Sequence, residues 1–388
     1  MCLNCPDKSG VQHQVPAAGS APSGGSRFTL CAEVPVGKAR RLQYTRVFAA
    51  SSASVASHDG QPYGLHYGQP LRPAITASKR AGQRQTDVSI LNSMTQNITI
   101  VGVGLIGGSF ALALREAGYE ARFVGVGRNE QSLQRAVELG IVDSYCTSLP
   151  EAVEKSDLVL LATPVGAIDT VLEKMAPALG SHTIVTDAGS VKQSVIESAR
   201  RHLANFENFV PAHPIAGTEH SGVEAGFASL YQGKRLILTP VAETSSTASE
   251  RVAAVWKSTG AIIEQMDPQH HDSVFAATSH LPHMLAFSLV ETLYRMDKES
   301  PVLHHAGGGF ADYTRIASSD PVMWRDVCLY NRDALLASLG KFRDGLDTLV
   351  NAIDSKDGET LEQLFVTAKR TRDTEVLRSA SLEKKSKN

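Results

Sequence analysis

The side chains that could carry chemistry lie in three short motifs of this 388-residue sequence. Asp187–Lys192 (DAGSVK) and His213–His220 (HPIAGTEH) each follow an apolar run typical of a strand, and Arg315 lies in a third motif, Gly307–Trp324. A neutral imidazole such as that of His213 can accept a proton from a hydroxyl group, and an unperturbed histidine already titrates near neutral pH. A guanidinium can hold a carboxylate with two parallel hydrogen bonds. The motifs therefore predict a site that binds an anion and removes a proton.

A glycine-rich loop, Gly102–Ser109 (GVGLIGGS), follows the apolar run Ile98–Val101 and precedes a helical stretch. In a GxGxxG loop of this setting, the first glycine permits a tight turn, the second lets the backbone approach a pyrophosphate, and the third allows close helix–strand packing. The free N–H groups at the start of the helix favour the phosphates. The sequence therefore predicts a dinucleotide site with these residues: Gly102, Gly104, Leu105, Ile106, Gly107, Gly127, Arg128, Thr163 and Pro164.

The end of the second predicted strand indicates which dinucleotide is preferred. Enzymes that use NAD usually place Asp or Glu there, to bind the ribose 2′-hydroxyl. This sequence reads Gly127-Arg128-Asn129 instead, and a guanidinium can grip a 2′-phosphate. We expect a preference for NADP; the alternative is that Arg128 stacks on adenine and that NAD binds as well. Further on, Thr163-Pro164 suits a helix N-cap followed by proline at the first helical position.

Alternating strand and helix patterns predict how these motifs are positioned. Helical stretches such as Phe110–Ala117 and Leu133–Leu139 lie between most of the β-rich runs. These runs are Ile98–Val101, Phe123–Val126, Leu158–Ala162, Ile184–Asp187, Phe209–Ala212 and Leu236–Thr239. Strands that alternate with helices form a parallel, doubly wound sheet. We therefore predict an α/β Rossmann-type domain over residues 94–267, with the chemical motifs at the carboxyl ends of strands.

From about Asp267 the pattern is helical, over roughly His270–Met296, Met323–Ile353 and Gly358–Leu377. We predict an all-helical C-terminal domain over residues 268–375, followed by a polar tail over 376–388. The second of these helices carries apolar residues at heptad-like spacing: Leu335, Leu339, Phe342, Leu346, Leu349 and Ile353. This seam is either a core stripe within one chain or a dimer interface.

Composition limits the classes of partner. The formal charge of −2 gives no reason to expect nucleic acid or an acidic membrane surface, and we expect no apolar run near the ~20 residues that cross a bilayer. The five irregularly spaced cysteines indicate no disulfide framework.

Residues 1–93 are rich in Ser, Ala, Gly and Pro and are predicted to be disordered, with Cys2 and Cys5 as a chance CxxC. We favour Met94 as the natural start and a cytoplasmic location; an organelle transit peptide is the alternative.

The motifs GVGLIGGS, DAGSVK, HPIAGTE, SHLPH and GGGFADYTRIASSDPVMWRD, in this order, make residues 97–375 resemble the prephenate/arogenate dehydrogenase family. The resemblance implies NAD(P)-dependent oxidative decarboxylation of prephenate or arogenate in tyrosine biosynthesis, by a homodimer joined through the helical domain, so it favours the seam as an interface. It implies His213, Ser190 and His280 as catalytic residues, with His283 close enough to confuse the third assignment. The implied substrate-binding residues are Arg315, Thr218, Gly308, Asp312 and Trp324, some of them reached across the dimer.

The sequence leaves other interpretations open. A related two-domain 3-hydroxyacid dehydrogenase or imine reductase is one, although His213 in the nucleotide-binding half speaks against it. A non-catalytic NADP-binding regulator is another, but it could dispense with His213, Ser190 and Arg315, which are all present. No metal site is expected, and we interpret His270-His271 and His304-His305 as solvated histidines. The choice between prephenate and arogenate stays open, with Glu219 as a hypothetical partner for the ammonium group of arogenate.

Overall fold

The computed structural model describes residues 96–298 and 300–377. The predicted disordered segment 1–93, its CxxC and the alternative start at Met94 lie outside the described residues. So does most of the predicted polar tail over 376–388.

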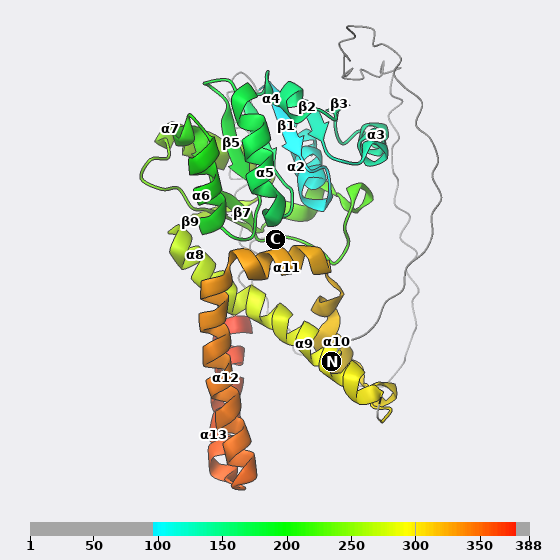
Figure 1. Cartoon of the computed structure of the whole chain (residues 1–388), viewed down its shortest axis with the longest axis vertical. Coiled ribbons are helices and arrows are strands. Elements are labelled where there is room, and N and C mark those ends of the chain that lie inside the picture. Colours follow the sequence, from blue (N-terminus) through cyan, green and yellow to red (C-terminus); the bar gives the residue numbers. More distant parts are fainter. Residues whose placement is uncertain (1–95, 299, 378–388) are drawn as a thin grey trace, which may run out of the picture. The chain divides into compact units, whose positions relative to one another are not determined.

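Six parallel strands form the main sheet of the N-terminal half, in the order β3-β2-β1-β4-β5-β6 (Figure 1). The strands are β1 (Asn97–Val101), β2 (Arg122–Val126), β3 (Ser144–Cys146), β4 (Leu158–Leu161), β5 (Ile184–Asp187) and β6 (Phe209–Val210). The order reverses beside β1, because the chain passes from β3 across the sheet to β4, which pairs with β1 on its other side. This topology confirms the predicted Rossmann-type fold, which binds ligands at such a reversal.

Helices and apolar side chains cover both faces of this sheet. The helices are α2 (Leu105–Glu116), α3 (Glu130–Glu138), α4 (Leu149–Val153), α5 (Val165–Met175) and α6 (Gln193–His202). Leu158 and Leu160 of β4 belong to one buried core, whereas Val159 and Leu161 belong to a second. This alternation follows from the two-residue period of a strand, and burial on both faces explains why the run LVLL is wholly apolar.

A second, smaller sheet corrects part of the predicted strand assignment. It contains β7 (Ala212–Pro214), β8 (Arg235–Leu238) and β9 (Ile262–Gln265), with β7–β8 antiparallel and β8–β9 parallel. The predicted strand Leu236–Thr239 therefore lies outside the main sheet, and Phe209–Ala212 is divided between the two sheets at Pro211. Proline has no N–H to donate to a strand ladder, which accounts for the division. Helix α7 (Ser246–Ser258) connects β8 and β9.

The C-terminal half is helical, as predicted, but its helices are interrupted. Its elements are α8 (Pro268–Phe275), a π-helical turn (Ala276–His280), α9 (Leu281–Asp297), α10 (Gly308–Thr314), α11 (Pro321–Tyr330), α12 (Arg332–Asp354) and α13 (Gly358–Thr371). The single helix predicted over 323–353 is broken at Asn331, whose φ of −111° and ψ of 35° are not helical. Helices α12 and α13 pack together as a hairpin (Figure 1).

The stretch Pro268–Asp297, from α8 to α9, is long and apolar enough by composition to cross a membrane, the one such helix among the described residues. This corrects the expectation that no segment reaches that length. The finding is weak evidence for a membrane span, because core helices of soluble proteins pass the same test. Its first turns are packed within protein, since Asp272 accepts hydrogen bonds from the backbone N–H groups of Lys192 and Gln193.

Candidate active site

The glycine loop between β1 and α2 has the geometry of a dinucleotide cradle. Gly102 has a φ of +98°, and a Cβ atom there would lie 2.6 Å from the carbonyl oxygen of Ala162, so only glycine suits the turn. A Cβ at Gly107 would clash with the carbonyl oxygen of Gly102, whereas one at Gly104 would meet no described atom within 4 Å. Gly102 and Gly107 thus allow close packing of the backbone, whereas Gly104 leaves open space before the N-terminus of α2. No described side chain caps that terminus, so the loop fits a bound pyrophosphate.

The other predicted cofactor residues stand at the carboxyl ends of β2 and β4. Gly127 and Arg128 follow β2 directly, and Arg128 is exposed. Pro164 is the N-cap of α5 rather than its first helical residue, which corrects the sequence-based placement by one position. The Oγ1 atom of Thr163 is buried without a hydrogen-bond partner among residues 96–298 and 300–377. A buried hydroxyl group without a partner is costly, so this atom is available to a bound ligand.

A buried ion pair, Asp187–Lys192, brackets the turn that carries Ser190. Both side chains are wholly buried. Lys192 Nζ donates to Asp187 Oδ2 and, at 2.6 Å, to the carbonyl oxygen of Ala212. Asp187 accepts from the backbone N–H groups of Gly189 at 2.8 Å and Ala212 at 3.0 Å. The pair therefore fixes the serine turn against β7, and leaves Ser190 half-buried.

His213 lies on β7, which pairs with β8 through Ile237. Its Nδ1 atom is 2.8 Å from Nε2 of His271, and His271 Nδ1 is in turn 2.8 Å from Oδ1 of Asp272. Phe275 packs edge-on against His213, with ring centroids 5.0 Å apart. His271 and Asp272 both come from α8 and are buried. The helical half of the chain therefore supplies the immediate neighbours of this imidazole.

The surroundings of His213 favour its neutral form. Burial lowers the pKa of this imidazole well below 6.5, and positive charge on His271, Lys192 or His280 would lower it further. Burial likewise lowers the pKa of His271, although Asp272 opposes that effect. The pKa of Asp272 itself lies below 3.8, because its hydrogen bonds to His271 and to two backbone N–H groups outweigh burial. Near neutral pH, a carboxylate thus stands behind two neutral imidazoles, and the outer one can accept a proton.

The second group of predicted residues gathers around Trp324, on α11. His283, on α9, stacks on the indole with centroids 3.7 Å apart. The guanidinium of Arg315 lies 3.7 Å from Glu219. Burial lowers the pKa of His283, the hydrogen bond to the carbonyl oxygen of Ser279 opposes that effect, and the charge of Arg315 lowers the pKa further. Arg315 and Glu219 are both exposed. An exposed cation beside a half-buried imidazole and an aromatic face can receive a carboxylate and an unsaturated ring.

His280 occupies a more interior position than His283. Its ring is 1% exposed and meets Trp324 edge-on at 5.9 Å. Asn331, at the break between α11 and α12, donates to His280 Nδ1 at 3.0 Å and to the carbonyl oxygen of Asp272 at 2.9 Å. Burial lowers the pKa of His280 to about 4. The proton of the neutral ring is therefore on Nε2, which is buried without a partner in the described part of the chain, as is Nε1 of Trp324.

Three further predicted substrate-binding residues, Thr218, Gly308 and Asp312, are exposed. Thr218, in the loop after β7, accepts a hydrogen bond from the backbone N–H of His220 at 3.2 Å. Gly308 and Asp312 lie on α10, and no described atom stands within 4 Å of a Cβ built at Gly308. None of the described contacts joins these three residues to His213. Helix α10 instead contacts α9 and the turn Arg315–Ser318, the elements that carry His283 and Arg315.

The sequence-based interpretation missed part of this cluster. His271 is buried and bonded on both ring nitrogens, so its interpretation as a solvated histidine is wrong; His270, His304 and His305 are exposed, as expected. Lys192 and Asp187 were visible in the DAGSVK motif, where only Ser190 received a role. The pair His271-Asp272 is a weaker indication of a functional site: two adjacent ionisable residues in a stretch that is otherwise largely apolar. Among residues 96–298 and 300–377, no group of His, Cys, Asp and Glu could hold a metal.

Comparison with known proteins identifies the family to which this site belongs. The family models described as "Prephenate dehydrogenase, nucleotide-binding domain" and "Prephenate dehydrogenase, dimerization domain" match residues 110–265 and 267–367. The chain is 40% identical over 279 residues to a cyclohexadienyl dehydrogenase of Zymomonas mobilis, covering 71% of this chain and 95% of that protein. It is 37% identical to a prephenate dehydrogenase of Bacillus subtilis, over 73% of this chain and 77% of that protein.

Solved structures agree with these sequence matches. Prephenate dehydrogenase from Aquifex aeolicus, crystallised with hydroxyphenyl propionate and NAD+, superposes with a TM-score of 0.67 at 41% identity, over 71% of this chain and 98% of that chain. Arogenate dehydrogenase from Synechocystis superposes with a TM-score of 0.60 at 30% identity, over 72% and 99% of the two chains. By these matches, the chain belongs to the prephenate dehydrogenase family of nicotinamide-dependent oxidoreductases.

Proposed function

We propose that this chain catalyses the oxidative decarboxylation of prephenate, arogenate or both, in tyrosine biosynthesis, with NADP as the preferred hydride acceptor. The observation that carries the proposal is the position of His213, whose Nδ1 atom is 2.8 Å from His271 Nε2 and whose burial favours the neutral imidazole. His213 stands on β7, which the Asp187–Lys192 pair ties to the Ser190 turn. In a chain of this family, an imidazole so placed is suited to accept the proton of a substrate hydroxyl group.

The reaction takes three groups from the substrate: a hydroxyl proton, a hydride ion and a carboxylate group. Such a substrate carries a hydroxyl group at ring carbon C4 and a carboxylate at C1, and bound NADP would take the hydride from C4. His213 accepts the hydroxyl proton as C4 becomes a carbonyl carbon, and Ser190 hydrogen-bonds the same oxygen. The C1 carboxylate then leaves as CO₂, its bonding electrons complete the aromatic ring, and the C4 oxygen takes back the proton from His213 to give the phenol. For the loss of CO₂, the protein need only hold the substrate in the reactive geometry.

We propose that Arg315 and His283 hold the substrate anion, with Trp324 as the packing surface. His283 is half-exposed, stacks on the indole and is close enough to Arg315 for that charge to affect its pKa, whereas His280 is enclosed. This favours His283 for contact with substrate, and gives His280 a supporting role behind Trp324. Thr218, Gly308 and Asp312 are exposed, and we propose that they contact the substrate from this chain or from a second one.

The preference for NADP rests on Arg128. It is exposed at the end of β2, where no carboxylate follows within Gly127–Asn129. A guanidinium there attracts a 2′-phosphate, and Gly127–Asn129 contains no carboxylate to bind the ribose 2′-hydroxyl in its place. The Aquifex aeolicus relative was crystallised with NAD+, so relatives of this chain do not all depend on a 2′-phosphate.

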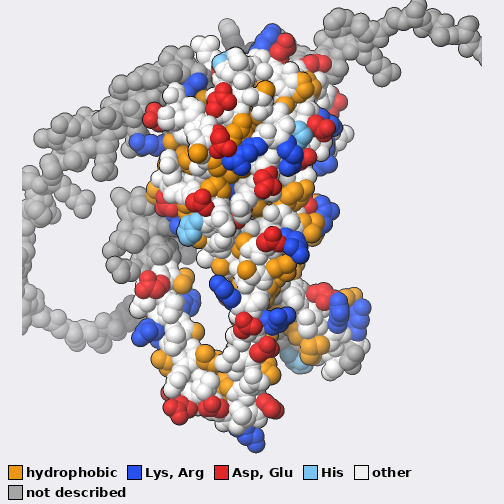
Figure 2. Space-filling view, turned by 60° about the vertical axis from the view of Figure 1, so that its left-hand side comes forward, with side chains coloured by type: hydrophobic (Ala, Val, Ile, Leu, Met, Phe, Trp, Pro, Cys, Tyr) orange, Lys and Arg blue, Asp and Glu red, His pale blue; other side chains and the backbone are white. Residues whose placement is uncertain are grey.

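We further propose that the helical half forms a homodimer. The C-terminal match is to a dimerization domain, and much of the predicted seam on α12 is uncovered in one chain: Phe342 is 41% exposed, Leu346 47% and Ile353 64%. The lower part of Figure 2, where the C-terminal helices lie, shows hydrophobic side chains at the surface. A groove of about 410 Å³ lies between α8–α9 and α12, beside the start of this seam, and Ala277, Leu281 and Phe342 are among its lining residues. Exposed apolar area of this kind is typical of an interface.

A four-way steady-state assay tests the proposal. The purified chain is given prephenate or arogenate, each with NADP or NAD, and the absorbance of the reduced nicotinamide is followed. We expect turnover with at least one substrate and a higher kcat/KM for NADP than for NAD. If folded protein turns over neither substrate with either dinucleotide, the proposed function is wrong. If NAD is preferred, the role given to Arg128 is wrong while the reaction stands.

A further inference from the structure

We infer that His271, anchored by Asp272, is a positioning residue that holds His213 in the tautomer with a proton on Nδ1 and a bare Nε2. The inference rests on the proposed function in one respect: it takes His213 as the group that accepts the substrate proton. Its structural part, the tautomer itself, is independent of any activity. The evidence for this tautomer is a series of hydrogen bonds that begins at Asp272.

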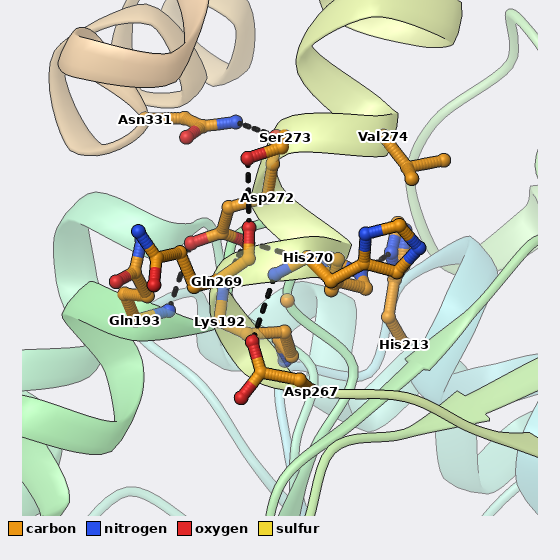
Figure 3. Close-up of polar contacts among 12 residues, drawn as sticks. Lys192, Gln193, His213, Asp267, Gln269, His270, Asp272, Ser273, Val274 and Asn331 are labelled. Atoms are coloured by element: carbon orange, nitrogen blue, oxygen red, sulfur yellow. Dashed lines mark hydrogen bonds and ion pairs between the residues drawn. The ribbon is translucent and has the colours of Figure 1, made fainter.

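The Asp272 carboxylate sets the direction of this series of hydrogen bonds. Oδ1 lies 2.8 Å from the backbone nitrogen of Lys192 and 2.8 Å from Nδ1 of His271, and Oδ2 lies 2.9 Å from the backbone nitrogen of Gln193. Figure 3 shows Asp272 facing the Lys192–Gln193 backbone from α8. An ionised carboxylate can only accept, and its three hydrogen bonds hold the pKa of Asp272 below 3.8. Nδ1 of His271 must therefore carry the proton.

The tautomer of His271 fixes that of His213. Burial lowers the pKa of His271, so the ring carries one proton near neutral pH. That proton is on Nδ1, which leaves Nε2 as an acceptor. The atom 2.8 Å from Nε2 is Nδ1 of His213, so His213 donates from Nδ1. Since His213 is also neutral, its Nε2 has no proton and can accept one.

The arrangement also assists the reaction after the proton arrives. When Nε2 of His213 takes the hydroxyl proton, positive charge spreads over the ring and strengthens the Nδ1–H bond to His271. The Asp272 carboxylate lies one imidazole further away and stabilises that charge. The charge of Lys192, close to the same groups, opposes this stabilisation, but it is paired with Asp187. A carboxylate behind an imidazole is the arrangement that orients histidine bases in other enzymes; this chain inserts a second imidazole between them.

Nitrogen NMR on the full chain tests the tautomer directly. The protein is labelled with ¹⁵N at its 13 histidines, and His213 is assigned by the signals lost in a His213→Asn variant. Near neutral pH, we expect Nδ1 of His213 to have the shift of a protonated ring nitrogen and Nε2 that of an unprotonated one. The opposite pattern would overturn the inference, whether or not the enzyme is active. The expected pattern without turnover of prephenate or arogenate would instead overturn the proposed function alone.

Two variants at His271 separate positioning from mere packing. His271→Leu removes the acceptor for His213, so we expect a mixed tautomer and a kcat lower by roughly 10- to 100-fold, with KM values within about threefold. His271→Gln brings a carbonyl oxygen that can accept the same hydrogen bond, so it should restore the Nδ1–H signal and much of the lost kcat. His270→Leu, at the exposed neighbouring position, is the matched control and should match the wild type. Equal losses of kcat in the Leu and Gln variants, with the tautomer unchanged in both, would contradict the inference.

Discussion

Replacing His280 by asparagine should flatten the acid side of the stability curve. Burial lowers the pKa of His280 from 6.5 to about 4, so the unfolded chain binds a proton at this residue at a higher pH than the folded chain does. The contribution of the neutral ring is complete above pH 6.5, and is lost as the pH falls from 6.5 towards 4. Asparagine keeps an acceptor near the place where Asn331 donates to His280 Nδ1, but it does not titrate.

The expected size follows from the two pKa values. They differ by about 2.5 units, which corresponds to about 3.4 kcal/mol when both titrations are complete. Between about pH 7 and about pH 4.5, the wild type should lose about 2.4 kcal/mol through this residue alone. His213, His271 and His283 also have lowered pKa values, so the wild type loses more in total. The variant shares those three histidines, so most of their contribution cancels in the difference between the two proteins.

Urea unfolding at a series of pH values measures this difference. Both proteins are unfolded at one fixed concentration, because dissociation of a dimer makes the unfolding free energy depend on concentration. We expect the wild-type and variant curves to diverge steadily below about pH 6.5, by roughly 2–3 kcal/mol at about pH 4.5. Parallel curves over this range would show that His280 titrates as an exposed histidine does, and would refute its enclosed position behind Trp324.

Three further outcomes are expected from the same structure. Arg128→Ala should raise the KM for NADP by roughly tenfold and change the KM for NAD little, because only NADP carries the 2′-phosphate. Equal changes in the two KM values, measured by steady-state kinetics, would show that Arg128 does not bind the 2′-phosphate. Lys192→Met leaves Asp187 buried without its partner and should cost about 3–5 kcal/mol in urea unfolding; a loss below about 1 kcal/mol would mean that the pair is not enclosed. Leu346→Asp places a charge in the seam and should give a folded monomer by light scattering and circular dichroism; an intact dimer would exclude this part of α12 from the interface.

Local sequence predicted the parts of the fold that local geometry determines. The glycine loop is one, since Gly102 and Gly107 are required by a positive φ and by close packing within a few residues. Sheet membership was harder, because Leu236–Thr239 has the composition of a central strand but is central in the smaller sheet, between β7 and β9, and not in the main one. Which strands pair is decided by tertiary contacts rather than by composition.

The site residues likewise differ in whether local sequence or tertiary contact determines their position. His213 stood out because a strand end and a following proline mark it within the sequence. His271 did not, because its partner His213 lies 58 positions away and its burial depends on contact between the two halves of the chain. The uncertainty between His280 and His283 has a local cause. The π-helical turn Ala276–His280 adds a residue to the helix and rotates the turns after it, so regular helical spacing cannot tell which histidine faces outward.

The most direct test of the central claim compares His213→Asn with the wild type, in turnover and in binding. Asparagine keeps a polar side chain but cannot act as a base near neutral pH. We expect kcat with prephenate or arogenate to fall by at least about 100-fold, while dissociation constants for substrate and NADP, from fluorescence titration, stay within about threefold. A variant that keeps most of its kcat would contradict the assignment of His213 as the proton acceptor, and with it the mechanism proposed for this chain.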